Sequence, residues 1–107
     1  MKTISVQELK EKIDAGTAPA IIDVREQHEW DMGHLDVARH MPMGEVPNRV
    51  SELTEYKEAE LIIHCRSGGR SGNVAQFLTS QGFTNVYNLT GGMLAWKDQI
   101  DPSFNVM

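Results

Sequence analysis

One segment of the sequence combines a reactive side chain with groups that stabilise an anion. Its centre is Cys65, the only cysteine in the chain, and the run 66–70 that follows has an arginine at each end of Ser-Gly-Gly. A cysteine sulfur is a nucleophile only as the thiolate, and nearby cations or a helix N-terminus favour that form. The segment therefore predicts a nucleophilic Cys65 in a site that also attracts a small anion.

The residues on either side predict how this sulfur is held in place. The apolar run 61–63 is typical of a buried strand, whereas apolar residues recur at helical spacing over 74–78. A helix from about 71 to 82 would direct its unpaired backbone N–H groups and its positive dipole end at the loop. With the glycines of the loop, these groups can form a nest for an anion.

The loop itself supplies the candidate substrate-binding residues. They are Arg66, Ser67, Gly68, Gly69 and Arg70. The arginines present fork-shaped donors suited to an oxyanion, and both glycines are expected to be required for backbone angles and close approach. Arg70 has a second interpretation, in which it braces the loop through a carboxylate. Ser67 either donates its hydroxyl to a bound sulfur or faces solvent.

Two neighbours of the loop have structural interpretations. Ser71 is expected to cap the helix that follows. His64 precedes the nucleophile, but successive side chains of a strand point to opposite faces, so we expect His64 to be packed. A lone cysteine is itself most often a small core residue. The two permanent cations beside Cys65 argue for the reactive interpretation instead.

Length and composition limit the classes of protein to consider. At 107 residues the chain is expected to form one domain, 1–107. The net charge of −5 argues against a nucleic-acid binder. No apolar run reaches the roughly 18 residues of a membrane span, and the polar N-terminus does not resemble a secretory signal. A single cysteine fits a reducing cytosol, so we expect a cytoplasmic protein.

Neither a metal nor a cofactor is expected. The four histidines show no paired ligand spacing with the single cysteine, which argues against a structural zinc site. The nucleotide-binding glycine motifs are also absent from the sequence. The chemistry is therefore expected to need no bound metal or cofactor.

Strands and helices are expected to alternate along the chain. Strands are expected near 3–4, 20–24, 37–41, 61–64 and 85–89, and helices near 5–16, 25–30, 46–53, 71–82 and 93–97. This alternation predicts an α/β layer fold with a parallel sheet. Cys65 would then lie at the carboxyl end of its strand, where open parallel sheets bind ligands.

Three motifs resemble those of the single-domain rhodaneses, the thiosulfate sulfurtransferases, and together they span most of the chain. They are Cys-Arg-Ser-Gly-Gly-Arg-Ser at 65–71, Asp-Val-Arg-Glu with Glu-Trp and Gly-His-Leu within 23–35, and Leu-Thr-Gly-Gly with Ala-Trp within 89–96. The chain departs from the pattern at Val37, where the family usually has Gly, outside the reacting loop. The resemblance implies a three-layer α/β/α fold with a five-stranded parallel sheet.

Four other residues of these motifs are expected to have structural roles. Asp23 and His34 are expected to be scaffold hydrogen-bonders, and Trp30 and Trp96 to be packing anchors. None of the four is expected to react.

The resemblance also implies a reaction. Cys65 would take the outer sulfur of thiosulfate, release sulfite and become a persulfide. Cyanide or a thiol acceptor, with thioredoxin among the candidates, would then remove the sulfur. Among the relatives, an arginine directly after the cysteine accompanies the use of thiosulfate rather than mercaptopyruvate, so Arg66 favours thiosulfate.

Two other functions remain open. Phosphatases and arsenate reductases with a cysteine nucleophile place five residues between Cys and Arg, whereas here only 66–69 separate Cys65 from Arg70. The shorter loop suits one sulfur atom better than a tetrahedral phosphate. A module that carries a persulfide to a protein partner would use the same residues.

Overall fold

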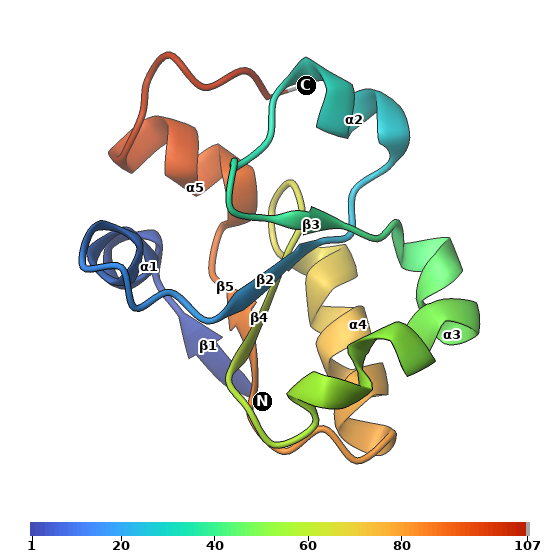
Figure 1. Ribbon diagram of the computed structural model, residues 1–107. Coiled ribbons are helices and arrows are strands. Elements are labelled where there is room, and N and C mark those ends of the chain that lie inside the picture. The colour runs from blue at the N-terminus through green and yellow to red at the C-terminus, as the bar shows by residue number, and fades with distance from the viewer. Residues whose placement is uncertain (107) are drawn as a thin grey trace.

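The computed structural model describes residues 1–106 and shows a five-stranded parallel sheet between layers of helices (Figure 1). The strands are β1 (Lys2–Ile4), β2 (Ala20–Asp23), β3 (Arg39–His40), β4 (Leu61–His64) and β5 (Val86–Leu89). Their order in the sheet is β1-β5-β4-β2-β3, and every pair is parallel. The predicted fold is confirmed, and the strand that leads to Cys65 is the central one.

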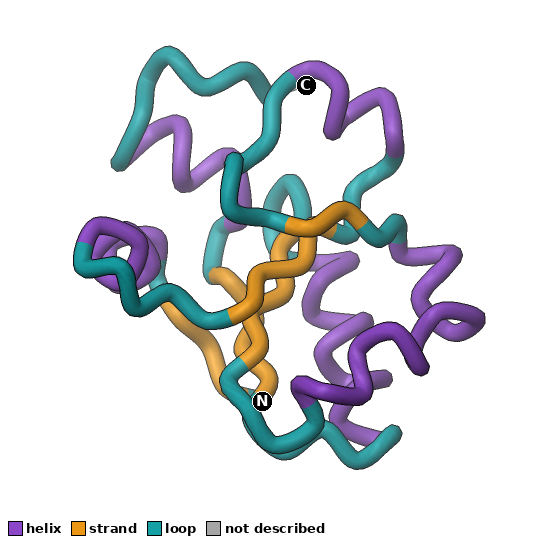
Figure 2. The backbone as a smooth tube through the Cα atoms, in the orientation of Figure 1, coloured by secondary structure: helices purple, strands orange, loops and turns teal. Residues whose placement is uncertain are grey.

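Helices cover both faces of this sheet. They are α1 (Val6–Asp14), α2 (Gln27–Met32), α3 (Val46–Arg49), α4 (Gly69–Ser80) and α5 (Gly92–Gln99), with 3₁₀ segments η1 (Met43–Glu45) and η2 (Val50–Tyr56) on either side of α3. Helices α1 and α5 lie on one side of the strands, and α3 and α4 lie on the other (Figures 1 and 2). The helix expected over 46–53 is only partly α-helical, although Val46 and Leu53 are buried as its apolar spacing predicted.

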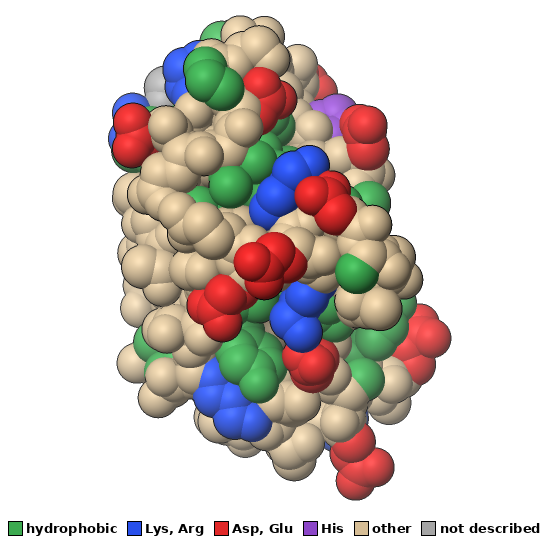
Figure 3. Space-filling model, turned by 90° about the vertical axis from the view of Figure 1, so that its left-hand side faces the viewer, with side chains coloured by type: hydrophobic (Ala, Val, Ile, Leu, Met, Phe, Trp, Pro, Cys, Tyr) green, Lys and Arg blue, Asp and Glu red, His purple; other side chains and the backbone are tan. Residues whose placement is uncertain are grey.

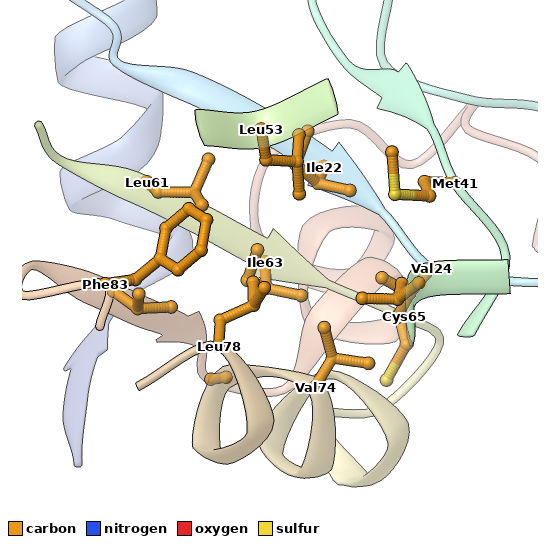
Figure 4. Packing of buried hydrophobic residues seen from close by; sticks show 13 residues of the cluster. Ile22, Val24, Met41, Leu53, Leu61, Ile63, Cys65, Val74, Leu78 and Phe83 are labelled. Carbon is orange, nitrogen blue, oxygen red and sulfur yellow. The ribbon is translucent and has the colours of Figure 1, made fainter. Parts of the chain in front are cut away.

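Strand β4 separates two hydrophobic cores. Ile63 and Cys65 pack with Leu78 and other residues of the α4 side, as Figure 4 shows. Ile62, one residue along, belongs to the opposite cluster, which includes Trp96. All four residues of β4 are buried, which explains why its first three residues are apolar without alternation.

The first helix shows the local signals that its sequence predicted. The Ser5 hydroxyl accepts a hydrogen bond from the Glu8 N–H at 3.1 Å, and the Glu8 carboxylate accepts one from the Ser5 N–H at 3.0 Å. This reciprocal capping box satisfies two N–H groups at the start of α1. Gly16, just beyond the C-cap residue Ala15, has a φ of +72°, as expected at a helix end.

Charges of both signs are interspersed on the face of the molecule shown in Figure 3. The exposed pairs include Lys10–Asp14 at 2.9 Å and Lys12–Glu60 at 3.9 Å. Such pairs contribute little to stability because water and salt screen them. Within residues 1–106, no helix has the length and apolar character needed to cross a membrane.

Candidate active site

The loop that follows β4 turns directly into helix α4. Gly68 is the N-cap of this helix and has a left-handed backbone with φ +114°, which a residue with a side chain rarely adopts. Gly69 has no such φ, and a Cβ there would meet no atom within 4 Å. The prediction that both glycines are required was therefore wrong for Gly69. The helix also begins two residues earlier than expected.

The sulfur of Cys65 lies among donors of this turn. The backbone N–H groups of Gly68 and Ser71 donate to Sγ over 3.1 and 3.4 Å, and the Ser71 hydroxyl oxygen lies 3.3 Å from it. Cys65 is only 1% exposed, so these groups, rather than bulk water, solvate the sulfur. The first turn of α4 adds the positive end of its dipole.

These contacts decide the protonation of Cys65. Burial raises the pKa of the thiol and is the largest single influence. The hydrogen bonds from Ser71 and from the N–H groups of Gly68 and Ser67 outweigh it, so the pKa lies below its ordinary value. The arrangement favours a thiolate, which is the nucleophilic form.

Ser71 has a different position from the one predicted. Because Gly68 is the N-cap, Ser71 is the third residue of α4 and does not cap it. Its buried hydroxyl donates to the Asn88 side-chain oxygen over 2.6 Å, and the Asn88 amide nitrogen donates to the Gly68 carbonyl over 3.1 Å. Asn88 was missed in the sequence, although a polar residue within the strand that pairs with β4 was an available signal.

Arg70 makes the bracing contact that was one of its two interpretations. Its two terminal nitrogens donate to the two carboxylate oxygens of Glu29 over 2.6 and 2.9 Å. Arg70 lowers the pKa of Glu29 to about 2, against the effect of burial, and the N–H of Glu26 adds to the lowering. The loop is thereby tied to the start of α2. The sequence placed Glu29 in a motif but gave it no partner.

Arg66 and Ser67 are exposed. The backbone of the loop is fixed by hydrogen bonds from the first turn of α5. The N–H of Met93 donates to the Cys65 carbonyl over 3.0 Å, and the N–H of Leu94 donates to the Arg66 carbonyl over 2.9 Å. This approach requires Gly92, because a Cβ there would lie 2.5 Å from the Cys65 carbonyl oxygen. The Gly-Gly motif before α5 therefore positions the loop.

A buried ion pair lies beside the last residue of β4. Asp23 accepts hydrogen bonds from the Arg25 Nε and Nη2 over 3.0 and 2.8 Å, and both side chains are fully buried. Arg25 also donates to the Gly33 carbonyl over 2.8 Å. Asp23 is thus a scaffold hydrogen-bonder, as the first motif suggested.

His64 lies close to this pair and is completely buried, as expected of a packed residue. Its Nε2 is 3.9 Å from the Asp23 carboxylate. Burial lowers the pKa of His64 to about 4, with Arg25 adding to this effect and Asp23 opposing it. The side chain is therefore neutral at neutral pH.

Trp30 and His34 also form a structural unit. Their rings stack with centroids 3.7 Å apart, and His34 Nδ1 lies 2.9 Å from the Trp30 carbonyl oxygen. Trp96 is 6% exposed and packs in the core on the α5 side. Among residues 1–106 no group of three potential metal-ligating side chains comes together.

The comparisons with known proteins agree with this geometry. The family profile of the rhodanese-like domain matches residues 5–99. The putative sulfurtransferase YtwF of Bacillus subtilis is 43% identical over 102 residues, which are 95% of this chain and 96% of that protein. The putative sulfur carrier protein YrkF of the same organism is 40% identical, over 92% of this chain and 52% of its own length.

A solved structure shows the same fold. The rhodanese-like domain protein from Staphylococcus aureus superimposes with a TM-score of 0.82 at 32% identity, covering 100% of this chain and 99% of that one. The likeness therefore extends over the sheet, both helical layers and the loop at residues 65–71.

Proposed function

Because the chain belongs to the rhodanese-like domain family, we propose that it is a thiosulfate sulfurtransferase that works through a persulfide on Cys65. The observation that carries this proposal is the set of N–H donors aimed at a buried sulfur, from Gly68 at 3.1 Å and Ser71 at 3.4 Å. Such donors stabilise a sulfur anion before reaction.

The first half-reaction loads the sulfur. The Cys65 thiolate attacks the outer sulfur of thiosulfate, a sulfur–sulfur bond forms to Cys65, and sulfite leaves with the electron pair of the bond that breaks. The negative charge passes from the Cys65 sulfur to the outer sulfur of the persulfide. Arg66 follows Cys65 directly in the chain and is exposed, so its guanidinium can attract the thiosulfate dianion to the loop.

The second half-reaction removes the outer sulfur from Cys65. Cyanide or a thiolate attacks the outer sulfur, and Cys65 leaves as the thiolate, ready for another cycle. We place this reaction in the cytoplasm, where reduced thiols such as thioredoxin are available as acceptors. Cofactor chemistry has no part in this scheme.

A turnover assay with thiosulfate and cyanide tests the proposal. The wild-type protein is expected to form thiocyanate, and Cys65→Ser to form none above the uncatalysed rate. Mass spectrometry after thiosulfate treatment is expected to show one added sulfur on the wild type that a thiol wash removes. Equal thiocyanate production by both proteins would refute the proposal.

A second candidate function is that of a persulfide carrier for a protein partner. The similarity to a relative named as a putative sulfur carrier protein favours it. A loaded protein that keeps its sulfur in cyanide but passes it to the thiol of reduced thioredoxin would support this function over the first. Cys65-dependent hydrolysis of an aryl phosphate would instead support a phosphatase, which the short loop disfavours.

A further inference from the structure

The hydroxyl of Ser71 lies between two acceptors. The Asn88 side-chain oxygen is 2.6 Å away, and the Cys65 sulfur is 3.3 Å away. A serine hydroxyl has one hydrogen, so it can donate to only one of them at a time. Ser71 is fully buried, so bulk solvent does not supply a substitute donor.

We propose that Ser71 and Asn88 form a hydrogen-bond switch that follows the charge on the Cys65 sulfur. When the sulfur carries its proton, the S–H donates to the Ser71 oxygen and the Ser71 O–H donates to Asn88. When the sulfur is an anion, the Ser71 O–H turns to it. Asn88 stays in place in both states because its amide nitrogen donates to the Gly68 carbonyl over 3.1 Å.

The switch has opposite effects in the two half-reactions, and this part rests on the proposed function. On loading, thiolate and thiosulfate become persulfide anion and sulfite, so the charge leaves the Cys65 sulfur and the Ser71 hydroxyl returns to Asn88. On unloading by cyanide, thiocyanate forms and the charge comes back to the Cys65 sulfur as the leaving group. Ser71 therefore stabilises the resting nucleophile and also assists its departure.

Ser71→Ala separates these effects. Loss of a hydrogen bond to a charged sulfur is expected to slow unloading to cyanide roughly tenfold across the range from about pH 6 to about pH 9. Loading is expected to slow only on the acid side, where less thiolate is present. On the alkaline side loading is expected to stay the same or to speed up, because a less stabilised thiolate is the better nucleophile.

Alkylation of Cys65 by iodoacetamide measures the same switch without any sulfur transfer. The pH profile of the rate is expected to move to higher pH in Ser71→Ala and to return towards the wild type in Ser71→Thr, which keeps the hydroxyl. Ser80→Ala is the matched control, because Ser80 is an exposed serine at the other end of α4. It is expected to leave the profile unchanged.

Asn88→Ala tests the competing acceptor in two backgrounds. Removing the Asn88 oxygen leaves the Ser71 hydroxyl to the sulfur, which favours the thiolate, while loss of the amide loosens Gly68 in either background. Near pH 6, the rate of Cys65 alkylation in Asn88→Ala relative to its parent can be measured in the wild-type and in the Ser71→Ala background. This ratio is expected to be roughly threefold or more higher in the wild-type background. Identical effects in both backgrounds would overturn the switch.

The outcomes distinguish the switch from the proposed function. If the protein shows no thiosulfate turnover but its alkylation profile still depends on Ser71, the switch is supported and the proposed function is refuted. If the protein turns over thiosulfate, the switch is refuted when Ser71→Ala slows both half-reactions equally at every pH and leaves the alkylation profile unchanged. Ser71→Gly provides a second deletion of the hydroxyl should the alanine variant not fold.

Discussion

The two arginines of the loop have the same charge but different surroundings. Arg70 is half-buried and is held by both oxygens of Glu29 over 2.6 and 2.9 Å, whereas the Arg66 side chain is exposed. A bidentate pair fixes both partners in orientation, so Arg70 acts on the shape of the loop. Arg66 is the cation better placed to meet an incoming anion.

Glu29→Gln should therefore affect the shape of the loop rather than the attraction of substrate. The amide keeps the size of the side chain but loses its charge and one acceptor oxygen, so Arg70 loses the bidentate ion pair. We expect the free energy of unfolding to fall by roughly 1–3 kcal/mol and the rate of Cys65 alkylation to fall with it. Denaturant unfolding measures the first effect, with the exposed Glu55→Gln as the matched control; equal stability of the two variants would contradict the bracing role.

Arg66→Ala should show the opposite pattern. Stability is expected to change little, because a surface position away from the core tolerates substitution. The KM for thiosulfate is expected to rise roughly tenfold, because one charge-assisted contact to the anion is lost. Steady-state kinetics check this, and neutral iodoacetamide is the control reagent. A KM equal to that of the wild type would remove Arg66 from the binding of thiosulfate.

At the residue scale, the sequence predicted which residues are reactive better than it predicted which residues contact one another. Cys65 and its loop were recognisable because a thiol, two glycines and two cations are adjacent in the chain. Glu29 is 41 residues from Arg70, and Asn88 is 17 residues from Ser71, so only the folded sheet brings them together. The capping role expected of Ser71 required a helix that begins at about 71, whereas Gly68 is the N-cap and α4 begins at Gly69.

At the scale of elements, two helix N-termini meet at the loop. Helix α4 directs N–H groups at the Cys65 sulfur, and α5 directs the N–H groups of Met93 and Leu94 at the carbonyls of Cys65 and Arg66. The first set solvates an anion and the second fixes the backbone that carries it. The loop keeps its shape through elements that come from both helical layers of the fold.

Gly92→Ala should therefore disturb the site more than Gly69→Ala does. A Cβ at Gly92 would lie 2.5 Å from the Cys65 carbonyl oxygen, on a backbone with φ +55°. We expect a loss of roughly 2 kcal/mol or more in unfolding free energy and a clear fall in Cys65 reactivity. Gly69→Ala, at an open helical position, is expected to be neutral or slightly stabilising. Denaturant unfolding of both variants checks this, and equal losses would contradict it.

The sequence predicted the central elements most accurately. β4 spans Leu61–His64, as its apolar run predicted, because a strand covered on both faces leaves a continuous apolar signal. β3 is only Arg39–His40, shorter than the expected 37–41, because the residues before it form a turn in which the Ala38 N–H donates to the Leu35 carbonyl over 3.0 Å. The 3₁₀ segments around α3 were not predicted, since apolar spacing reports which face is buried and not the type of helix.

At the scale of the whole molecule, the site stands at the carboxyl end of the central strand, above a buried polar group. Asp23 and His64 are the paired last residues of β2 and β4, Arg25 lies two residues beyond β2, and all three are fully buried. A buried ion pair is costly to separate, because each partner would be left as an unpaired charge away from water. Folding is thus coupled to the protonation of these buried groups beneath the reactive loop.

This coupling predicts a loss of stability in acid. The pKa of His64 is about 4 in the folded protein, against an ordinary value of 6.5 for the unfolded chain, so the unfolded chain binds more protons between these values. Above pH 6.5 the histidine is neutral in both states, and its contribution to the free energy of unfolding is fully present. As the pH falls from 6.5 towards 4, the unfolded chain takes up the proton and the free energy of unfolding decreases. The loss amounts to about 3 kcal/mol at 1.4 kcal/mol per pKa unit.

Replacing His64 by glutamine should flatten this dependence. Urea unfolding at a series of pH values is expected to show a smaller decline for His64→Gln than for the wild type between pH 6.5 and pH 4, although the variant starts from a lower stability. His28→Gln is the matched control, because His28 is exposed and its replacement should leave the slope unchanged. Parallel slopes for the wild type and His64→Gln would show that the buried histidine does not limit stability in acid.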